Sequence, residues 1–183
     1  MSDLLVFGKR AGEFAAKFAK ENQHGAINTG EIENVVHEAL RPFERREGEN
    51  PYTLQRDLQE TMQDNVGIVR TEAEMKSQLD HLRKLWKRAS EVGVSGNREF
   101  NPGWHTALDL KNLLTVSEAI ARSAIERKES RGAQFREDYP EKDAKFASVN
   151  TIVWCGDDGS MNVRLEPLIE MPDNLKQVIE EMK

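Results

Sequence analysis

The sequence contains a single cysteine, Cys155, among its 183 residues, so no disulfide can form within the chain. Long hydrophobic runs are also missing: no uninterrupted apolar run exceeds four residues, as in the stretch 4–7, whereas a membrane-spanning helix needs about 20. The opening Met1-Ser2-Asp3 lacks the positive start and apolar centre of a secretory signal. We therefore expect a reduced, cytosol-facing protein.

The sequence also has no excess of positive charge. The 26 basic and 32 acidic residues give a net charge of -6 and a pI near 5.4. This balance removes the broad electrostatic attraction on which non-specific nucleic-acid binding depends. Basic residues do cluster in 41–46 and 84–88, but they are interspersed with other residues in the way of a solvated helix face. No nucleic-acid partner is predicted.

Motifs that carry chemistry are incomplete. The histidines are scattered and form no zinc signature, and neither a Gly-x-Gly-x-x-Gly nor a Walker sequence occurs. The acidic pair at 157–158 lacks the alternating ligands and closing glutamate of a calcium loop, so a tight turn is expected there. Cys155 lies in a predicted strand, where a lone cysteine is more often a small buried hydrophobe than a nucleophile. The residues themselves therefore predict no catalytic, cofactor or metal site.

The chain has the length of one ordinary domain, or of one domain with an appendage, and its first element is predicted to be a helix over 3–20. One stripe of this helix consists of small residues at spacings of three and four, and phenylalanines form a second apolar sector: Gly8, Ala11, Gly12, Ala15, Ala19, Phe7, Phe14 and Phe18. A helix that is apolar over so much of its circumference is suited to burial against another backbone.

The middle of the chain predicts amphipathic helices joined by short or moderate loops. One helix is expected from Glu31 to Pro42, and a second starts with Asn50-Pro51 as cap and first turn. A third opens with a capping box from Thr71 to Glu74 and closes at Gly93; a fourth runs from Asn101-Pro102 to about Glu129, before Gly132. Such connections favour an antiparallel, up-down helical bundle, similar to a spectrin repeat, in a mainly α protein.

After Pro140 the pattern changes to that of strands. β-branched residues are frequent in 146–154, the stretch 156–160 is a turn, and 161–165 alternates, which together predict one small β-hairpin. A last short helix is expected from Pro172-Asp173. The predicted organisation is a first segment 1–27, a bundle over 28–140 and a hairpin with tail over 141–183.

The stretch 127–140 carries more charge than a bundle requires, at the point where the long helix stops. One interpretation is a helix carboxyl-terminal cap, with cations placed favourably against the helix dipole. The other is an electrostatic contact with a neighbouring domain or subunit, for which arginine forks paired with carboxylates are suited. The residue types alone leave both open.

This stretch and three others resemble the carboxyl-terminal region of the flavoprotein subunit of succinate dehydrogenase and fumarate reductase. Residues 129–140 read ESRGAQFREDYP and follow LTVSEAIARSA at 114–124. The opening SDLLVFGKRAG at 2–12 resembles the helix that closes the FAD-binding domain in this family, and RDLQ at 56–59 resembles the start of its helical domain. Trp154 and the turn after it are similar to the family's terminal hairpin. The resemblance covers nearly the whole chain.

The resemblance implies that the chain is a fragment. In the family, the dinucleotide fingerprint and the groups that bind FAD and the dicarboxylate lie upstream of the matching region. We therefore expect no cofactor in this chain, and we expect FAD in the parent enzyme. The parent enzyme would oxidise succinate to fumarate and pass electrons to an iron-sulphur subunit. The fragment alone is expected to be inactive, with residues 1–27 as the terminal helix of the missing FAD-binding domain.

The resemblance also implies partners and a location. The chain would dock on its own FAD-binding domain and on the iron-sulphur subunit. The complex would lie in the cytoplasm or at the cytoplasmic face of the inner membrane, and the chain would contact the membrane only through the complex. Its exposed first helix makes self-association an expectation. The candidates for docking are the charged and aromatic residues of the matching motif: Arg127, Glu129, Arg131, Arg136, Asp138 and Tyr139.

Two positions depart from the family pattern. Gln134 stands where the family often has histidine, and glutamine cannot titrate in its place. Ala144 stands where a second acid is common. Two alternatives remain: the C-terminal domain of an L-aspartate oxidase, and a free-standing helical interaction module. An upstream reading frame that carries a dinucleotide fingerprint would distinguish the flavoprotein from the module.

Overall fold

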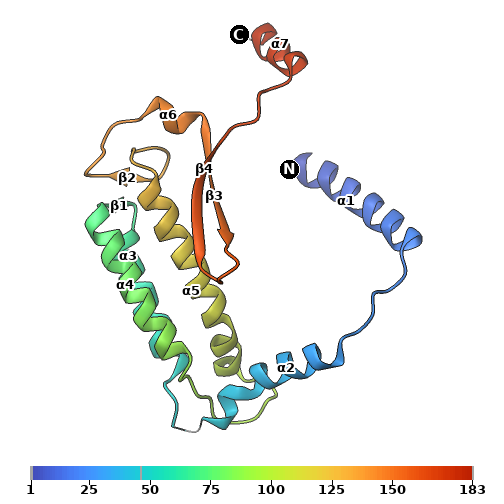
Figure 1. The fold of residues 1–183 in the computed structure, drawn as a ribbon, viewed down its shortest axis with the longest axis vertical. Coiled ribbons are helices and arrows are strands. Elements are labelled where there is room, and N and C mark those ends of the chain that lie inside the picture. The colour runs from blue at the N-terminus through green and yellow to red at the C-terminus, as the bar shows by residue number, and fades with distance from the viewer. Residues whose placement is uncertain (1, 46, 183) are drawn as a thin grey trace. The chain divides into compact units, whose positions relative to one another are not determined.

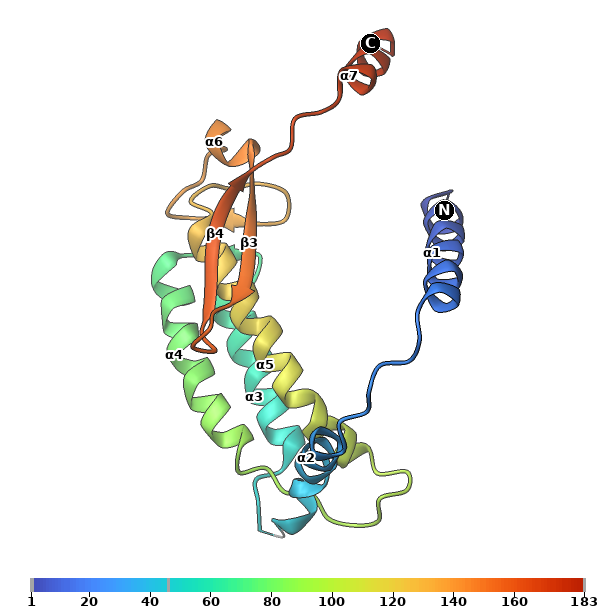
Figure 2. The same cartoon turned by 45° about the vertical axis from the view of Figure 1, so that its right-hand side comes forward.

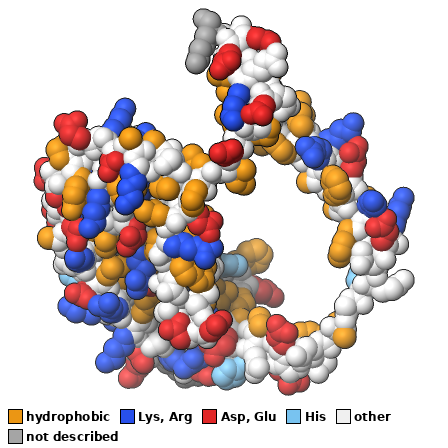
Figure 3. Space-filling view, turned by 45° about the horizontal axis from the view of Figure 1, so that its top comes forward, with side chains coloured by type: hydrophobic (Ala, Val, Ile, Leu, Met, Phe, Trp, Pro, Cys, Tyr) orange, Lys and Arg blue, Asp and Glu red, His pale blue; other side chains and the backbone are white. Residues whose placement is uncertain are grey.

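A computed structural model describes residues 2–45 and 47–182, and the chain divides between Glu38 and Ala39 into two compact units. The described chain is mainly α, as predicted, with two small two-stranded sheets, of which only the antiparallel hairpin was predicted (Figure 1). Acidic and basic side chains are interspersed over the face seen in Figure 3. The predicted domain boundaries after residues 27 and 140 stay predictions.

The first unit contains helix α1 (Ser2–Glu21) and most of helix α2 (Thr29–Leu40). Both predicted helices are confirmed. No residue of α1 is buried, and Phe7, Phe14 and Phe18 are about two-thirds exposed, at 64%, 65% and 67%. A Cβ added at Gly8 or Gly12 would meet nothing within 4 Å. The small-residue stripe predicted to pack against another backbone is therefore uncovered within the described chain.

Three long helices form the body of the second unit. Helices α3 (Pro51–Val66), α4 (Glu72–Ala89) and α5 (Pro102–Glu126) pack against one another and run up, down and up (Figures 1 and 2). Their shared core contains Leu54, Leu58, Leu82, Leu85, Val92, Leu110 and Leu114, with a second cluster of Val66, Met75, Ala121 and Ala124. The spacing of these residues by three and four along each helix is the spacing on which the bundle was predicted. The likeness to a spectrin repeat stays a prediction.

Polar residues set where the three helices begin. The Asn50 side chain accepts a hydrogen bond from the Tyr52 amide at 2.9 Å, and Asn101 accepts one from the Trp104 amide at 3.0 Å. Thr71 and Glu74 form the predicted capping box. Each cap satisfies amide groups that the first turn of a helix leaves unpaired, so these starts are encoded locally.

Two predicted helix ends were wrong. Helix α4 ends at Ala89 rather than at Gly93, and α5 ends at Glu126, before Glu129 and Gly132. Gly93 instead lies against Gly48: its amide donates to the Glu49 carbonyl at 3.1 Å, and a Cβ on it would stand 1.9 Å from the Arg45 carbonyl oxygen. This glycine permits a close approach of two loops, which helix periodicity does not encode.

A short 3-10 helix, η1 (Arg41–Glu44), leads from α2 to the bundle. The Trp104 indole donates to the Ala39 carbonyl at 2.7 Å and meets Phe43 edge to face, with the ring centroids 5.3 Å apart. These contacts hold the segment 39–44 on the first turn of α5.

The strands lie around α5. Strands β1 (Val69–Arg70) and β2 (Phe135–Arg136) pair in parallel, and a single-turn helix α6 (Ala144–Ala147) precedes the predicted hairpin of β3 (Val149–Cys155) and β4 (Met161–Pro167). Both hairpin strands pack on α5 (Figures 1 and 2). Helix α7 (Asp173–Glu181) confirms the last predicted helix.

The expectation that Cys155 is buried was wrong. Its side chain is exposed at the last position of β3, although its register partner Met161 on β4 is half-buried. Strand assignment alone does not tell which of two paired residues is covered.

Candidate functional site

The candidate site is the segment that follows α5, residues 127–143. Its fold is set by Ser130, whose hydroxyl accepts from the Arg136 amide at 2.9 Å and donates to the Tyr139 carbonyl at 2.9 Å. The backbone of Arg131 and Gln134 closes the loop with two hydrogen bonds of 3.0 and 3.1 Å. Gly132 at the tip has a φ of 62°, a conformation that glycine adopts without strain. The chain therefore returns along the end of α5.

Arg136 is fully buried at the end of α5. Its Nη1 donates to the carbonyls of Ala124, Ile125 and Arg127, at 2.8, 3.3 and 3.2 Å. Its Nε and Nη2 each lie 2.7 Å from an oxygen of Asp138. The last carbonyls of a helix have no partner within the helix and carry partial negative charge, so this guanidinium stabilises both the hydrogen bonding and the dipole of α5.

Glu129 is a carboxylate of the same segment, and its side chain has no exposed surface. One of its oxygens accepts from Arg127 at 2.7 Å and from Arg131 at 2.8 Å, and the other accepts from the Asp143 amide at 3.0 Å. A buried carboxylate needs partners of this kind, because its desolvation is otherwise costly. Glu129 thus joins the two ends of the segment.

Both carboxylates are held in the charged form. Hydrogen bonds from Arg131 and Arg127 lower the pKa of Glu129 to about 2, although burial acts in the opposite direction. The Arg136 fork, helped by the Glu72 amide, lowers the pKa of Asp138 to about 2. The two ion-pair clusters are therefore charged throughout the neutral and mildly acidic range.

The predicted docking residues divide into two groups. Glu129 and Arg136 are fully buried, and their polar atoms bind within the chain. Three other side chains are partly exposed: 24% of the surface of Arg127, 37% of that of Arg131 and 30% of that of Asp138. Tyr139 is half-buried, and its ring centroid lies 5.0 Å from the Arg136 guanidinium. The capping interpretation therefore describes Arg136, and the surface that remains for contacts lies on the partly exposed residues.

Gln134 has a defined contact within the loop. Its side-chain amide donates to the carbonyls of Arg127 and Glu129, both at 3.1 Å. In this chain the Gln134 side chain holds the loop through hydrogen bonds of an amide group, which does not titrate.

Sequence reasoning missed the contribution of Glu72, Arg70 and Thr151. The Glu72 amide, at the start of α4, donates to Asp138 at 2.9 Å across 66 residues of sequence. Arg70 and Thr151 line one pocket with Arg127 and Gln134, although they stand 81 positions apart. No local signal brings them together; only the parallel pairing of β1 with β2 and the packing of the hairpin on α5 do so.

The sheets of the described residues are a parallel pair of two-residue strands and one antiparallel hairpin. Neither is the doubly wound parallel sheet on which dinucleotides typically bind. Among residues 2–45 and 47–182 no group of His, Cys, Asp or Glu is placed to hold a metal ion. None of the helices described is long and apolar enough to cross a membrane.

The fold and the capped α5 end define a three-helix domain with a β-hairpin packed on its last long helix. A sequence model of the family described as "Fumarate reductase flavoprotein C-term" matches residues 55–178, and the chain belongs to this family. This confirms the resemblance to the flavoprotein subunit of succinate dehydrogenase and fumarate reductase.

Individual relatives agree. The fumarate reductase flavoprotein subunit of Haemophilus influenzae is 32% identical over 173 residues, which are 92% of this chain and 28% of the relative. The succinate dehydrogenase flavoprotein subunit of Coxiella burnetii is 36% identical over 143 residues, 77% of this chain and 24% of the relative. The structure of Mycobacterium smegmatis Sdh1 in complex with UQ1 superposes with a TM-score of 0.86 at 42% identity, over 98% of this chain and 31% of that one. The chain thus spans a quarter to a third of the length of these relatives.

Proposed function

We propose that the chain serves as the C-terminal helical domain of an enzyme that oxidises succinate to fumarate, or runs the reverse reaction. In this enzyme FAD, bound outside the present chain, accepts hydride, and an iron-sulphur subunit takes the electrons. The observation that carries the proposal is the similarity to Sdh1 over 98% of the chain at 42% identity. The three long helices α3, α4 and α5 pack on a shared apolar core, which supports a scaffold role for this part.

The segment after α5 supports a docking role. Arg136 and Glu129 hold the segment from inside, so that Arg127, Arg131 and Tyr139 present a fixed, partly exposed arrangement. Preorganised arginines lose little conformational entropy when they bind a partner. We assign these residues and Asp138 to contacts with the FAD-binding domain or the iron-sulphur subunit.

Helix α1 supports contact with the FAD-binding domain. Its apolar side chains are exposed, and Gly8 and Gly12 leave room for another backbone. Exposed apolar faces of this size mark interaction surfaces. In the chain by itself the same face leads to self-association, and contact with a membrane arises only through the assembled complex.

A fusion protein tests the proposal. The present chain replaces the matching C-terminal part of Sdh1 from M. smegmatis, and the purified fusion is assayed for retained flavin and for succinate-dependent reduction of a dye. Intact Sdh1 is the positive control, and Sdh1 that lacks its C-terminal part is the negative control. The proposal predicts retained flavin and activity well above the truncated protein. A fusion that behaves like the truncated protein contradicts it.

A further inference from the structure

An open pocket of about 530 Å³ lies along α5, and Arg70 of β1 and Thr151 of β3 contribute to its lining. Its polar lining includes Arg70, Arg127, Gln134 and Thr151, and its apolar wall is Val116, Ala119 and Ile120 of α5. None of its described lining residues is Asp or Glu. The pocket therefore combines positive charge with an apolar wall.

Two residues that line this pocket each have a buried polar atom without a partner among the described residues: the Nε of Arg70 and the Oγ1 of Thr151. Buried polar groups are nearly always hydrogen-bonded, and each exception calls for an explanation. Arginine only donates and a threonine hydroxyl is able to donate, so a group that only accepts satisfies both. An ionised carboxylate is such a group.

The charge of Arg70 is uncompensated. Arg136, its register partner across the parallel strands, is paired with Asp138, whereas Arg70 forms no ion pair with any described residue. Burial and the nearby Arg136 charge lower the pKa of Arg70, which means that the surroundings disfavour its charged form. Arg127 adds a second guanidinium, although its Nη2 is already bonded to Glu129 and to the Phe146 carbonyl, at 2.7 and 2.8 Å.

The rim of the pocket indicates what presents the carboxylate. Val116 and Ile120 are 57% and 45% exposed, and they continue the apolar wall onto the open surface of α5. An arginine beside exposed apolar residues is typical of a protein interface. The methylene groups of an acidic side chain fit this wall better than a strongly hydrated phosphate does.

We propose that this pocket is the docking site for an Asp or Glu side chain from the flavin-binding part of the enzyme, which pairs with Arg70 and accepts from Thr151. The proposal rests on the proposed function, since the flavin-binding part accounts for the two-thirds or more of the relatives that this chain does not cover. It adds the recognition chemistry: one carboxylate, one guanidinium and one hydroxyl.

The pocket is tested first in the chain by itself, with acetate as a probe for a side-chain carboxylate. Acetate is titrated at constant ionic strength against sodium chloride, and the Arg70 Nε–H signal is followed in a proton–nitrogen correlation spectrum. We expect a saturable shift with a dissociation constant on the order of millimolar, weakened roughly tenfold or more by Arg70→Gln. Thr151→Val is the second variant, and far-ultraviolet circular dichroism checks that both fold.

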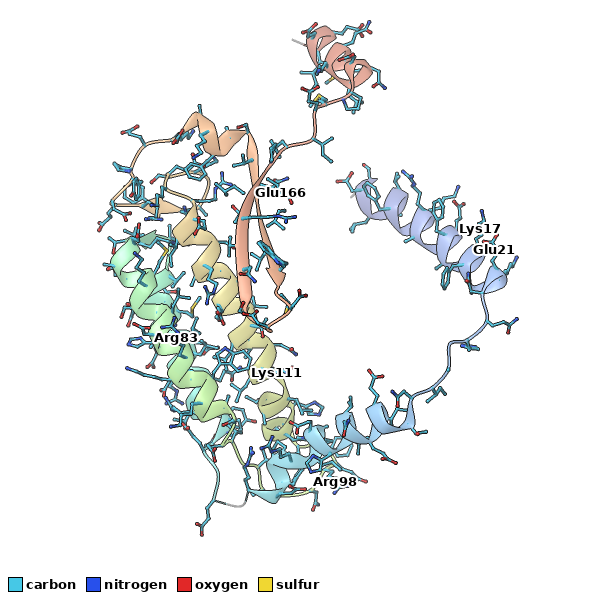
Figure 4. The ribbon with its side chains drawn as sticks, viewed as in Figure 1. Lys17, Glu21, Arg83, Arg98, Lys111 and Glu166 are labelled. Carbon is cyan, nitrogen blue, oxygen red and sulfur yellow. The ribbon has the colours of Figure 1, made fainter. Side chains whose placement is uncertain are left out.

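Arg83→Gln is the matched control, because it removes the same charge from an exposed position. Arg83 lies on α4, with 70% of its side chain exposed and paired with Asp80 (Figure 4). This variant should bind acetate like the unmodified chain. Absence of a saturable shift at Arg70, or an equal loss in Arg83→Gln, overturns the proposal.

The second arm uses the fusion with Sdh1. Arg70→Gln should lower the temperature of flavin release by about 3 °C or more, whereas Arg83→Gln should leave it unchanged. If acetate binds but both fusions release flavin alike, the pocket takes free carboxylates and the docking proposal is overturned. If the unmodified fusion holds no flavin, the proposed function itself fails and docking fails with it, while the acetate titration still decides what the pocket binds.

Discussion

Arg136 and Asp138 form a two-pronged ion pair, with Nε to Oδ1 and Nη2 to Oδ2 both at 2.7 Å, directly beneath the last carbonyls of α5. The same guanidinium donates to the carbonyls of Ala124 and Ile125 in α5 and to that of Arg127 just after it. One buried residue thus joins the end of a helix to the strand that follows it, and Asp138 connects both to the first turn of α4.

Arg136→Lys should destabilise the chain although it keeps the positive charge. Lysine cannot reproduce the planar fork, so at least one charge-assisted hydrogen bond is lost, at a cost of about 2 kcal/mol. Arg136→Met should cost about 3 kcal/mol or more, since it also leaves Asp138 without its partner. Urea unfolding followed by circular dichroism measures both.

The control for these variants is Arg83→Lys on the exposed face of α4, which should change the free energy of unfolding by less than about 0.5 kcal/mol. Equal stability of Arg136→Lys and Arg83→Lys would show that the buried fork is not a structural requirement.

Stability should fall in acid because of Glu129. Its pKa is about 2 in the folded chain and 4.5 as the ordinary value, so the unfolded chain binds the proton more readily. The stabilisation is fully present above about pH 4.5 and disappears as the pH falls toward 2; Asp138 acts in the same direction. The free energy of unfolding, measured in urea at a series of pH values, should decline across this window.

Glu129→Gln isolates this effect. At pH 7 the variant should be less stable than the unmodified chain, because Arg127 and Arg131 lose their anion. The difference should shrink as the pH approaches 2, where the native carboxyl takes up its proton. A difference that is constant from pH 7 to 2 would mean that the Glu129 charge does not contribute to stability.

Gly93→Ala should destabilise the bundle by about 3 kcal/mol. A methyl group there would stand 1.9 Å from the Arg45 carbonyl oxygen and 2.9 Å from the Gly48 Cα, and both neighbours are backbone. Gly30→Ala in α2 is the control, since its nearest neighbour would lie at an ordinary 3.5 Å. Urea unfolding of both variants measures the effect. Equal unfolding midpoints would mean that the loops at Gly48 and Gly93 move apart without a loss of stability.

Removal of residues 1–21 should leave the bundle folded and reduce self-association. None of the residues of α1 is buried, so no core contact is lost, while its exposed apolar side chains disappear. Sedimentation velocity of the shortened and full chains measures association. Unfolding of the shortened chain, or unchanged association, would contradict the role given to α1.

The sequence predicted those features that neighbouring residues encode. Asn50, Thr71 and Asn101 begin their helices through hydrogen bonds that span only two or three positions. The hairpin follows in the same way from a turn between alternating strands. Interactions of this kind are independent of the rest of the fold, so a pattern within a short window is sufficient to predict them.

The site could be predicted only in part. The charged stretch after α5 suggested both a cap and a docking element, but its residue types could not show that Arg136 is buried while Arg131 is partly exposed. The contact of Asp138 with the Glu72 amide and the shared pocket of Arg70 and Thr151 depend on tertiary packing over 66 and 81 positions. No periodicity or motif extends over such separations.

The visible absorption spectrum of the purified chain tests the central claim most directly, because a bound isoalloxazine ring absorbs visible light and the protein itself does not. The chain is incubated with FAD, freed of unbound flavin by gel filtration and measured. We expect a colourless protein, with colour retained only when the chain is fused to the flavin-binding part. A flavin that remains on the chain alone would show a cofactor site within these residues and would contradict the scaffold role.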